Sequence, residues 1–307
     1  DPEAATRELS KAVELQRKIN LRYPDSEFAS TENLSDLESR LGLLQSFEDL
    51  LALQEGHREL QRALAERRVF EARERLPELI LKKDEILNRY PSNHSTLVEL
   101  DFQLTYLHLL REDLMEIQDE IYDKLRPLPG YPHHSLLAVE VNQELYTRVM
   151  GKNPSSEKDP HLPVDRVSFT AANEFCRRVS WILGLPASLP ESTQVEAVLE
   201  VSSPAVAEGQ IWSFEMAEGR FRPTHSTQEN RYGFGDLLGN VAEWVQSEDD
   251  SSPLVWGGSA ALGQGEILQI PALSLAPDQP HQGVGFRFLV HRKGELQALA
   301  LLEKLAF

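Results

Sequence analysis

Cysteine is almost absent from this sequence, with one residue, Cys176, in 307 positions. A single cysteine excludes an internal disulfide framework and leaves the redox compartment of the protein undecided. Free cysteines mostly behave as small buried hydrophobic residues. No nearby motif supplies a base that would activate this thiol as a nucleophile, so we expect a structural role for it.

Long hydrophobic runs and excess positive charge are also missing. No run of about 18 apolar residues occurs, so we expect no membrane-spanning segment. No signal peptide is visible, and the opening Asp1-Pro2-Glu3 is typical of a helix start, which favours a processed or trimmed chain. The formal net charge is −18 and no basic stripe offsets it, which disfavours nucleic-acid binding.

Glycine is scarce in the first 126 residues, where only Gly42 and Gly56 occur. Apolar residues recur there every three or four positions, as on the buried face of a helix. Pro127, Pro129 and Gly130 end the pattern. The last apolar stripe predicts one long helix and consists of Leu97, Leu100, Leu104, Leu107, Leu110, Leu114, Ile117, Ile121 and Leu125.

An internal repeat is present in this helical region. Residues 19–24 (INLRYP) resemble residues 86–91 (ILNRYP), at an offset of 86 − 19 = 67 residues. The repeat predicts two helical hairpins, each with a Tyr-Pro turn, in a bundle or a tetratricopeptide-like array. Pro77 either interrupts the third helix or lies in its first turn. Apolar positions follow the same offset in the pairs Leu9 and Leu76, Val13 and Ile80, and Leu37 and Leu104.

The composition changes near Leu136, where glycine and proline become frequent, as in a compact α+β domain. Six short blocks follow in order: EVNQELY at 140–146, MGKNPS at 150–155, PVDRVSF at 163–169, GFGDLLGNVAEW at 233–244, WGGS at 256–259 and GFR at 285–287. In this order they resemble the formylglycine-generating (sulfatase-modifying) enzyme family. The resemblance covers about residues 136–291.

The resemblance implies a C-type-lectin-like fold for the second half of the chain. The whole sequence therefore predicts an α+β protein with two domains, helical hairpins over residues 1–130 and a family-like domain over residues 131–307. Asn142 is expected to cap the first helix of the second domain. Residues 294–307 have an amphipathic pattern that predicts a further helix.

The 233–244 block contains the candidate metal ligands. In the family a calcium ion lies at this kind of turn, so the resemblance implies Asp236, Asn240 and Glu243 as its ligands and Ca²⁺ as the cofactor. Hard carboxylate oxygens, together with turn carbonyls, suit an ion that takes six to eight oxygen ligands. The alternative is a glycine-pinned turn whose Asn and Asp side chains cap their own backbone.

This chain lacks the residues that carry out the catalytic reaction of the family. Catalytic members carry a copper-binding cysteine pair between the WGGS and GFR blocks, and the soft thiolates hold Cu(I) there. Residues 260–282 contain no cysteine. We therefore expect no catalytic residues and no enzyme activity.

Two function classes remain. The first is a non-catalytic binding or scaffolding protein, a lectin-like module on a helical stalk that recognises a protein partner or a small ligand, as a sensor or a complex subunit. The second is a metal-dependent enzyme of the formylglycine-generating and sulfoxide synthase superfamily, which needs a three-histidine cluster. His57, His94 and His108 lack the expected close spacing. The resemblance favours an extracytoplasmic location in a bacterium.

His133 and His134 are adjacent, which raises the question of a metal site at the start of the second domain. Adjacent strand residues point to opposite faces of a sheet, so the two side chains are not expected to share a ligand. We interpret them as residues of the domain junction.

Overall fold

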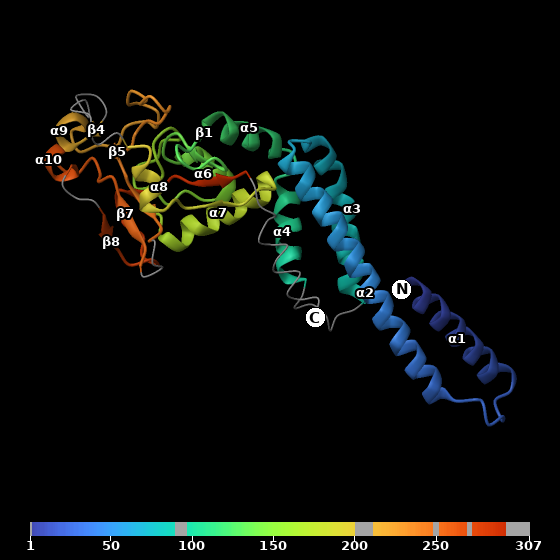
Figure 1. Cartoon of the computed structure of the whole chain (residues 1–307). Helices are drawn as coiled ribbons and strands as arrows, with labels where there is room; N and C mark the ends of the chain where they lie inside the picture. The colour runs from blue at the N-terminus through green and yellow to red at the C-terminus, as the bar shows by residue number, and fades with distance from the viewer. Residues whose placement is uncertain (1, 90–96, 200–210, 248–251, 269–271, 293–307) are drawn as a thin grey trace. The chain divides into compact units, whose positions relative to one another are not determined.

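The computed structural model describes residues 2–89, 97–199, 211–247, 252–268 and 272–292 (Figure 1). The chain forms two compact units. The first comprises Asp1–Ala63 and Arg68–Arg111, and the second comprises Leu64–Arg67 and the described residues from Glu112 onward. The architecture is α+β, as predicted, with a helical N-terminal region followed by a part that contains sheets. The domain boundary at residue 130 stays a prediction.

The first unit is built from helices. They are α1 (Pro2–Arg22), α2 (Thr31–Ala65, which runs two residues into the second unit), α3 (Val69–Arg89) and α4 (Val98–Leu109). Figure 1 shows α1 (dark blue) folded back alongside α2. Polar contacts join this hairpin: Arg17 Nη2 donates to Glu38 Oε1 at 2.7 Å, and Thr6 Oγ1 to Glu48 Oε1 at 2.8 Å.

The starts of the helices follow the 67-residue repeat, whereas α4, with 12 residues, is much shorter than α2, with 35. Helices α1 and α3 both have 21 residues, and Pro2 plus 67 gives Val69, the first residue of α3. Likewise Thr31 plus 67 gives Val98, where α4 begins. Pro77 lies inside α3 and neither ends the helix nor falls in its first turn. The second Tyr-Pro turn lies outside the described residues.

The prediction of one long helix over residues 97–125 is wrong. The helix is interrupted between α4 and α5 (Leu114–Lys124). The backbone of Leu110 leaves the helical region there, with φ −89° and ψ 4°. The N–H of Leu110 bonds back to the carbonyls of Tyr106 and His108, which closes the last turn of α4. Buried Leu107 and Leu114 keep the apolar spacing across the break, so periodicity alone does not reveal it.

The second unit contains short strands in three sheets. The strands are β1 (Leu125–Pro127), β2 (His134–Leu137), β3 (Ala187–Ser188), β4 (Ile211–Trp212), β5 (Leu238–Gly239), β6 (Ala242–Val245), β7 (Leu254–Trp256), β8 (Leu273–Ser274), β9 (Val284–Gly285) and β10 (Leu289–His291). The sheet orders are β1-β2-β10-β3, β4-β5 and β8-β7-β6-β9. The GFR block at residues 285–287 begins at the last residue of β9 and leads into β10. Because β9 and β10 belong to different sheets, this segment connects two of the sheets.

Helices complete the second unit. They are α5, α6 (Gln143–Met150), α7 (Phe169–Leu183), α8 (Ser192–Glu196), α9 (Phe214–Ala217) and α10 (Gln264–Ile267). The predicted cap of α6 is confirmed, because Asn142 Oδ1 accepts from the Leu145 N–H at 2.9 Å. Tyr146 of α6 stacks on Phe175 of α7 with ring centroids 5.6 Å apart, and Phe175 meets Phe286 at 5.1 Å. These rings anchor both helices next to the GFR block.

Two further predictions concern a C-terminal helix and the absence of a membrane-spanning segment. The amphipathic helix predicted at residues 294–307 lies outside the described residues. Among the helices of the described ranges, none combines the length and the apolar character that crossing a membrane requires.

Candidate functional site

The 233–244 motif folds into a buried turn whose shape depends on glycine. Gly239 belongs to β5, which pairs in parallel with β4, and its φ is +80°. A Cβ atom on Gly239 would lie 2.2 Å from the carbonyl oxygen of Trp212, so no other residue fits without moving backbone. The neighbouring Asn240 N–H donates to that same carbonyl at 3.0 Å. The turn therefore presents Asp236, Asn240 and Glu243 toward the interior of the second unit.

Glu243 forms an ion pair with Arg287 of the GFR block. Arg287 Nε donates to Glu243 Oε2 at 2.6 Å, and Nη2 donates to Oε1 at 2.7 Å. The exposed fractions of the two residues are 2% and 0%. Arg287 also donates to the carbonyl of Ala138 at 3.1 Å and to that of Asp236 at 2.8 Å. Because both oxygens of Glu243 accept a guanidinium N–H, this carboxylate is saturated by the protein.

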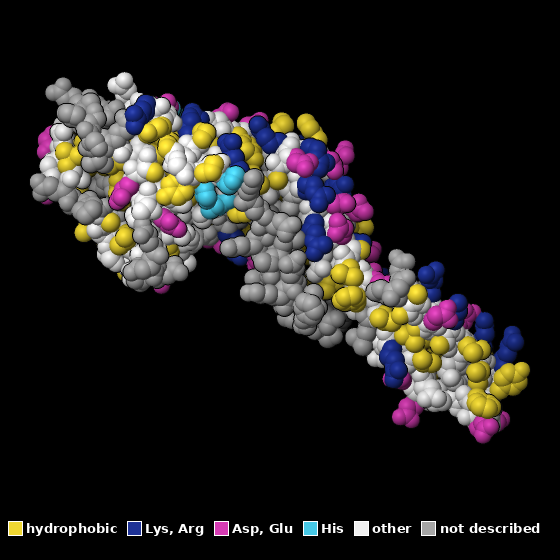
Figure 2. Space-filling view, viewed as in Figure 1, with side chains coloured by type: hydrophobic (Ala, Val, Ile, Leu, Met, Phe, Trp, Pro, Cys, Tyr) yellow, Lys and Arg dark blue, Asp and Glu magenta, His cyan; other side chains and the backbone are white. Residues whose placement is uncertain are grey.

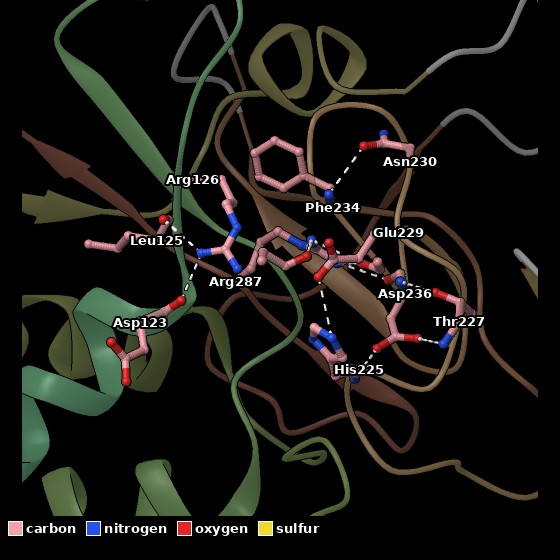
Figure 3. Close-up of polar contacts among 12 residues, drawn as sticks. Asp123, Leu125, Arg126, His225, Thr227, Glu229, Asn230, Phe234, Asp236 and Arg287 are labelled. Carbon is pink, nitrogen blue, oxygen red and sulfur yellow. Dashed lines mark hydrogen bonds and ion pairs between the residues drawn. The ribbon is translucent and has the colours of Figure 1, made fainter.

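Asp236 holds a neighbouring loop by its backbone. Figure 3 shows its carboxylate directed at residues 225–227, where it accepts from the N–H of His225 and from that of Thr227, the latter at 3.0 Å. In return, the Asp236 N–H donates to Thr227 Oγ1 at 2.6 Å. His225 also contacts Glu229 at 3.3 Å. Asp236 therefore acts as a cap for the backbone of a separate loop, residues 225–227, rather than for the backbone of its own turn.

Asn240 is likewise satisfied by the protein. Its φ is +56°, a region that Asn tolerates better than most residues. Oδ1 accepts from the Arg222 N–H at 2.9 Å, and Nδ2 donates to the Arg222 carbonyl at 3.1 Å. Nδ2 also donates to Glu140 Oε1 at 3.1 Å. Asn240 therefore binds the backbone of Arg222 and the side chain of Glu140.

Glu140 is the residue of this site that sequence reasoning missed. It is 1% exposed, and its Oε2 has no hydrogen-bond partner among the described residues. The available signal was a charged residue between two apolar ones, Val139 and Val141, which are both buried. An acid at the centre of such a run has to be paired or neutral.

The electrostatics of the cluster follow from burial. Burial raises the pKa of Glu140 well above its ordinary value, and the neighbouring charges of Asp236 and Glu243 raise this pKa further. Burial also raises the pKa of Glu243, although the charge of Arg287 opposes the shift. For Arg287 burial disfavours the charged form, but the contacts with Glu243 outweigh this and raise its pKa. Among the acids of this cluster, Glu140 is the one whose charged form is most opposed, because burial and two neighbouring carboxylates all raise its pKa.

The three predicted ligands do not fit a calcium ion in this arrangement. Calcium requires several carboxylate and carbonyl oxygens converging on one point. Here the oxygens of Asp236 and Asn240 point at backbone N–H groups, and the Arg287 guanidinium lies against Glu243. In the described part of the chain no group of three or more His, Cys, Asp or Glu side chains is placed to hold a metal. Calcium binding at these residues stays a prediction, and their contacts oppose it.

Cys176 lies on α7 as a free, buried cysteine. The residue is 2% exposed, and burial raises the pKa of its thiol. A thiol that stays protonated is a poor nucleophile and a poor metal ligand. The structural role expected from the sequence agrees with this environment.

The second unit, with its glycine-pinned turn and its buried pair of Glu243 and Arg287, is a domain of the formylglycine-generating-enzyme-like class. The chain belongs to that family, because the sulfatase-modifying factor enzyme 1-like domain matches residues 117–292, more than half of its length. No curated protein matches the chain.

Two solved structures are similar to part of the chain. Treponema denticola variable protein 1 shares 20% sequence identity, with 55% of this chain and 91% of that chain covered and a TM-score of 0.46. PvdO from Pseudomonas aeruginosa shares 15% identity, with 54% of this chain and 86% of that chain covered and a TM-score of 0.45.

Proposed function

We propose that this protein is a non-catalytic binding or scaffolding protein, in which a lectin-like domain of the family is joined to a helical stalk. The observation that carries the proposal is the state of its one thiol. Cys176 is buried in the helix core and its pKa is raised. The oxidation carried out by catalytic relatives needs a cysteine pair that holds copper and exchanges disulfides, and this sequence has one cysteine in all.

The turn that accompanies that chemistry in the family supports the same proposal. The polar atoms of Asp236, Asn240 and Glu243 bond to the protein itself, so they stabilise the turn, and each of these three side chains has protein partners. A site saturated in this way suits a structural element better than a site that has to bind and release a reactant.

The activity test is direct. The purified protein is incubated with copper, reductant and a cysteine-containing sulfatase peptide, and conversion of the cysteine to formylglycine is followed by mass spectrometry. We expect no conversion under conditions in which a catalytic family member is active. Turnover by this chain would refute the proposal. Stoichiometric iron in the purified protein would instead favour the superfamily's metal-dependent enzymes.

The partner we propose is a protein that docks on exposed apolar side chains of the helical unit. At the tip of the α1–α2 hairpin, Leu21 is 83% exposed, Tyr23 63% and Phe28 68%. Figure 2 shows hydrophobic side chains gathered over this hairpin. Exposed aromatic clusters of this kind are typical of protein-binding surfaces.

The partner is identified by pull-down with the full chain and then tested as a purified protein. The double variant Tyr23→Ser, Phe28→Ser is expected to weaken the measured affinity at least tenfold. The matched variant Phe214→Ser, Met216→Ser removes exposed apolar residues of the second unit. Loss with this second variant alone would move the binding surface to the second unit. Loss with neither would contradict apolar docking.

We also propose an extracytoplasmic location in a bacterium, on the strength of the family resemblance. Cell fractionation of the native host tests it. Recovery of the protein in the cytoplasmic fraction would contradict it.

A further inference from the structure

We propose that His134 and His291 form a two-histidine site for a divalent transition-metal ion such as Zn²⁺ or Ni²⁺. The two residues lie directly opposite each other on the antiparallel strands β2 and β10. Opposite residues of such a pair place their side chains on the same face of the sheet, with Cβ atoms about 5 Å apart. Neither residue belongs to the turn that contains Asp236 and Glu243.

The ring geometry is close to that of a chelate. The ring centroids of His134 and His291 are 4.6 Å apart with an interplanar angle of 71°. A tetrahedral ion at about 2.0–2.1 Å from one nitrogen of each ring would hold the two nitrogens about 3.3 Å apart and the centroids about 5 Å apart. The two rings would therefore have to move apart only slightly to bind an ion between them.

The state of the ring nitrogens points to a ligand. His134 Nδ1 is shielded from solvent and has no hydrogen-bond partner among the described residues. Buried polar atoms are nearly always paired with protein, water or a ligand. His291 Nε2 lies 2.9 Å from Ser188 Oγ on β3, a contact that fixes the orientation of this ring. A hydroxyl that orients an imidazole plays the part that outer groups play around metal-binding histidines.

The surroundings of His291 favour its neutral imidazole form. Metal ions bind the neutral imidazole. Burial lowers the pKa of His291, and the neighbouring His134 lowers it further. The ring of Tyr131 meets His134 edge-on at 5.8 Å, and Arg292, which follows His291 directly, is exposed. The formal charge of −18 draws cations to the molecule as a whole.

The donor set defines the class of metal. Two imidazoles suit zinc, nickel and copper, whereas calcium and magnesium prefer oxygen ligands. No third His, Cys, Asp or Glu joins the pair within the described ranges, so water would occupy the other positions. A site with two protein ligands exchanges its metal readily and resembles an open site more than a closed structural one.

The experiment is calorimetric titration of tag-free, full-length protein with Zn²⁺ or Ni²⁺ alone at about pH 7.5, above the ordinary pKa of a histidine side chain. We expect one ion per chain. The variants His134→Gln and His291→Gln should each weaken the affinity at least about tenfold. His133→Gln is the matched control, because His133 is exposed and directly precedes β2. This variant should bind like the unmodified protein.

Two outcomes would overturn the proposal: binding that survives both substitutions, or an equal loss with the control variant. Circular dichroism of each variant identifies a folding defect. The unmodified protein gives an independent readout, since bound Cu²⁺ should show hyperfine coupling to two imidazole nitrogens in its electron paramagnetic resonance spectrum. Coupling to a single nitrogen would also refute the site.

Discussion

Glu243 and Arg287 lie 44 positions apart in the chain and meet in a two-pronged ion pair with both side chains buried. The pair links the strand β6 of one sheet to the segment that enters β10 of another. Arg287 then binds the carbonyls of Ala138 and Asp236, so one guanidinium holds three separate segments of the second unit. Its energetic role can be measured.

Substitution of Glu243 by Gln should destabilise the second unit strongly. Removing one partner leaves the other charge buried and unpaired, which costs about 3–5 kcal/mol of unfolding free energy. Urea unfolding, followed by tryptophan fluorescence, measures the change. The control is Glu116→Gln on α5 of the same unit, which removes the contact between exposed Glu116 and Arg148 and should cost less than about 1 kcal/mol. Equal effects for the two variants would show that burial of the Glu243 pair is not decisive.

Glu140 should make the second unit less stable as the pH rises. Burial raises its pKa in the folded state. The unfolded chain therefore releases the proton first, and stability falls by about 1.4 kcal/mol per pH unit from about pH 4.5 up to the folded-state pKa. Glu140→Gln removes this loss and keeps an acceptor for Asn240.

The measurement for Glu140 is urea unfolding at a series of pH values from about pH 5 upward, over which the stability advantage of the Gln variant should grow until the folded-state pKa of Glu140 is passed. Glu144→Gln, at an exposed position of α6, serves as the control and should run parallel to the unmodified protein. A constant difference between Glu140→Gln and the unmodified protein would mean that Glu140 is already ionised in the folded state.

The sequence predicts local features of this fold and misses its long-range pairings. The Asn142 cap follows from a signal within a few residues, and the helical repeat follows from the 67-residue offset, but neither predicts the boundary between α2 and α3. The 233–244 block was recognised as a turn, but its side chains find partners that no local pattern marks. Asp236 holds residues 225–227, and Glu140, 100 positions before Asn240, completes the cluster. Such contacts depend on tertiary packing, and so does the break after α4.

Added calcium should leave the thermal stability of the protein unchanged. The oxygens of Asp236, Asn240 and Glu243 already accept protein hydrogen bonds, so an ion would have to displace Arg287 or the 225–227 backbone. The test compares melting temperatures with millimolar Ca²⁺ and with the same concentration of Mg²⁺. A rise specific to calcium would establish the ligand set that the family resemblance implies, since an ion that binds only the folded state stabilises it.

His57 should make the helical unit sensitive to acid. Burial lowers its pKa from 6.5 to about 4. The unfolded state gains the proton first as the pH falls, so stability present above about pH 6.5 is lost on the way to about pH 4, by roughly 3 kcal/mol in total. Circular dichroism of helix unfolding against pH measures the slope. His57→Gln cannot gain this charge, and the slope should decrease in this variant. Identical slopes would place the acid sensitivity in other groups.

Gly239 should tolerate no side chain, because of both its positive φ and the close approach of the Trp212 carbonyl. A substitution at a second glycine, Gly151, separates the contributions of these two effects. Gly239→Ala faces both a φ of +80° and a Cβ 2.2 Å from the Trp212 carbonyl. Gly151 has a φ of +72° but nothing within 4 Å of the added Cβ, so Gly151→Ala measures the backbone strain alone, about 1–2 kcal/mol. The Gly239 variant should lose several kcal/mol more, because the backbone of β4 has to move away from β5. Urea unfolding of both variants gives the difference. Similar losses would mean that the strand pair yields easily and that the close approach at Trp212 does not hold the turn.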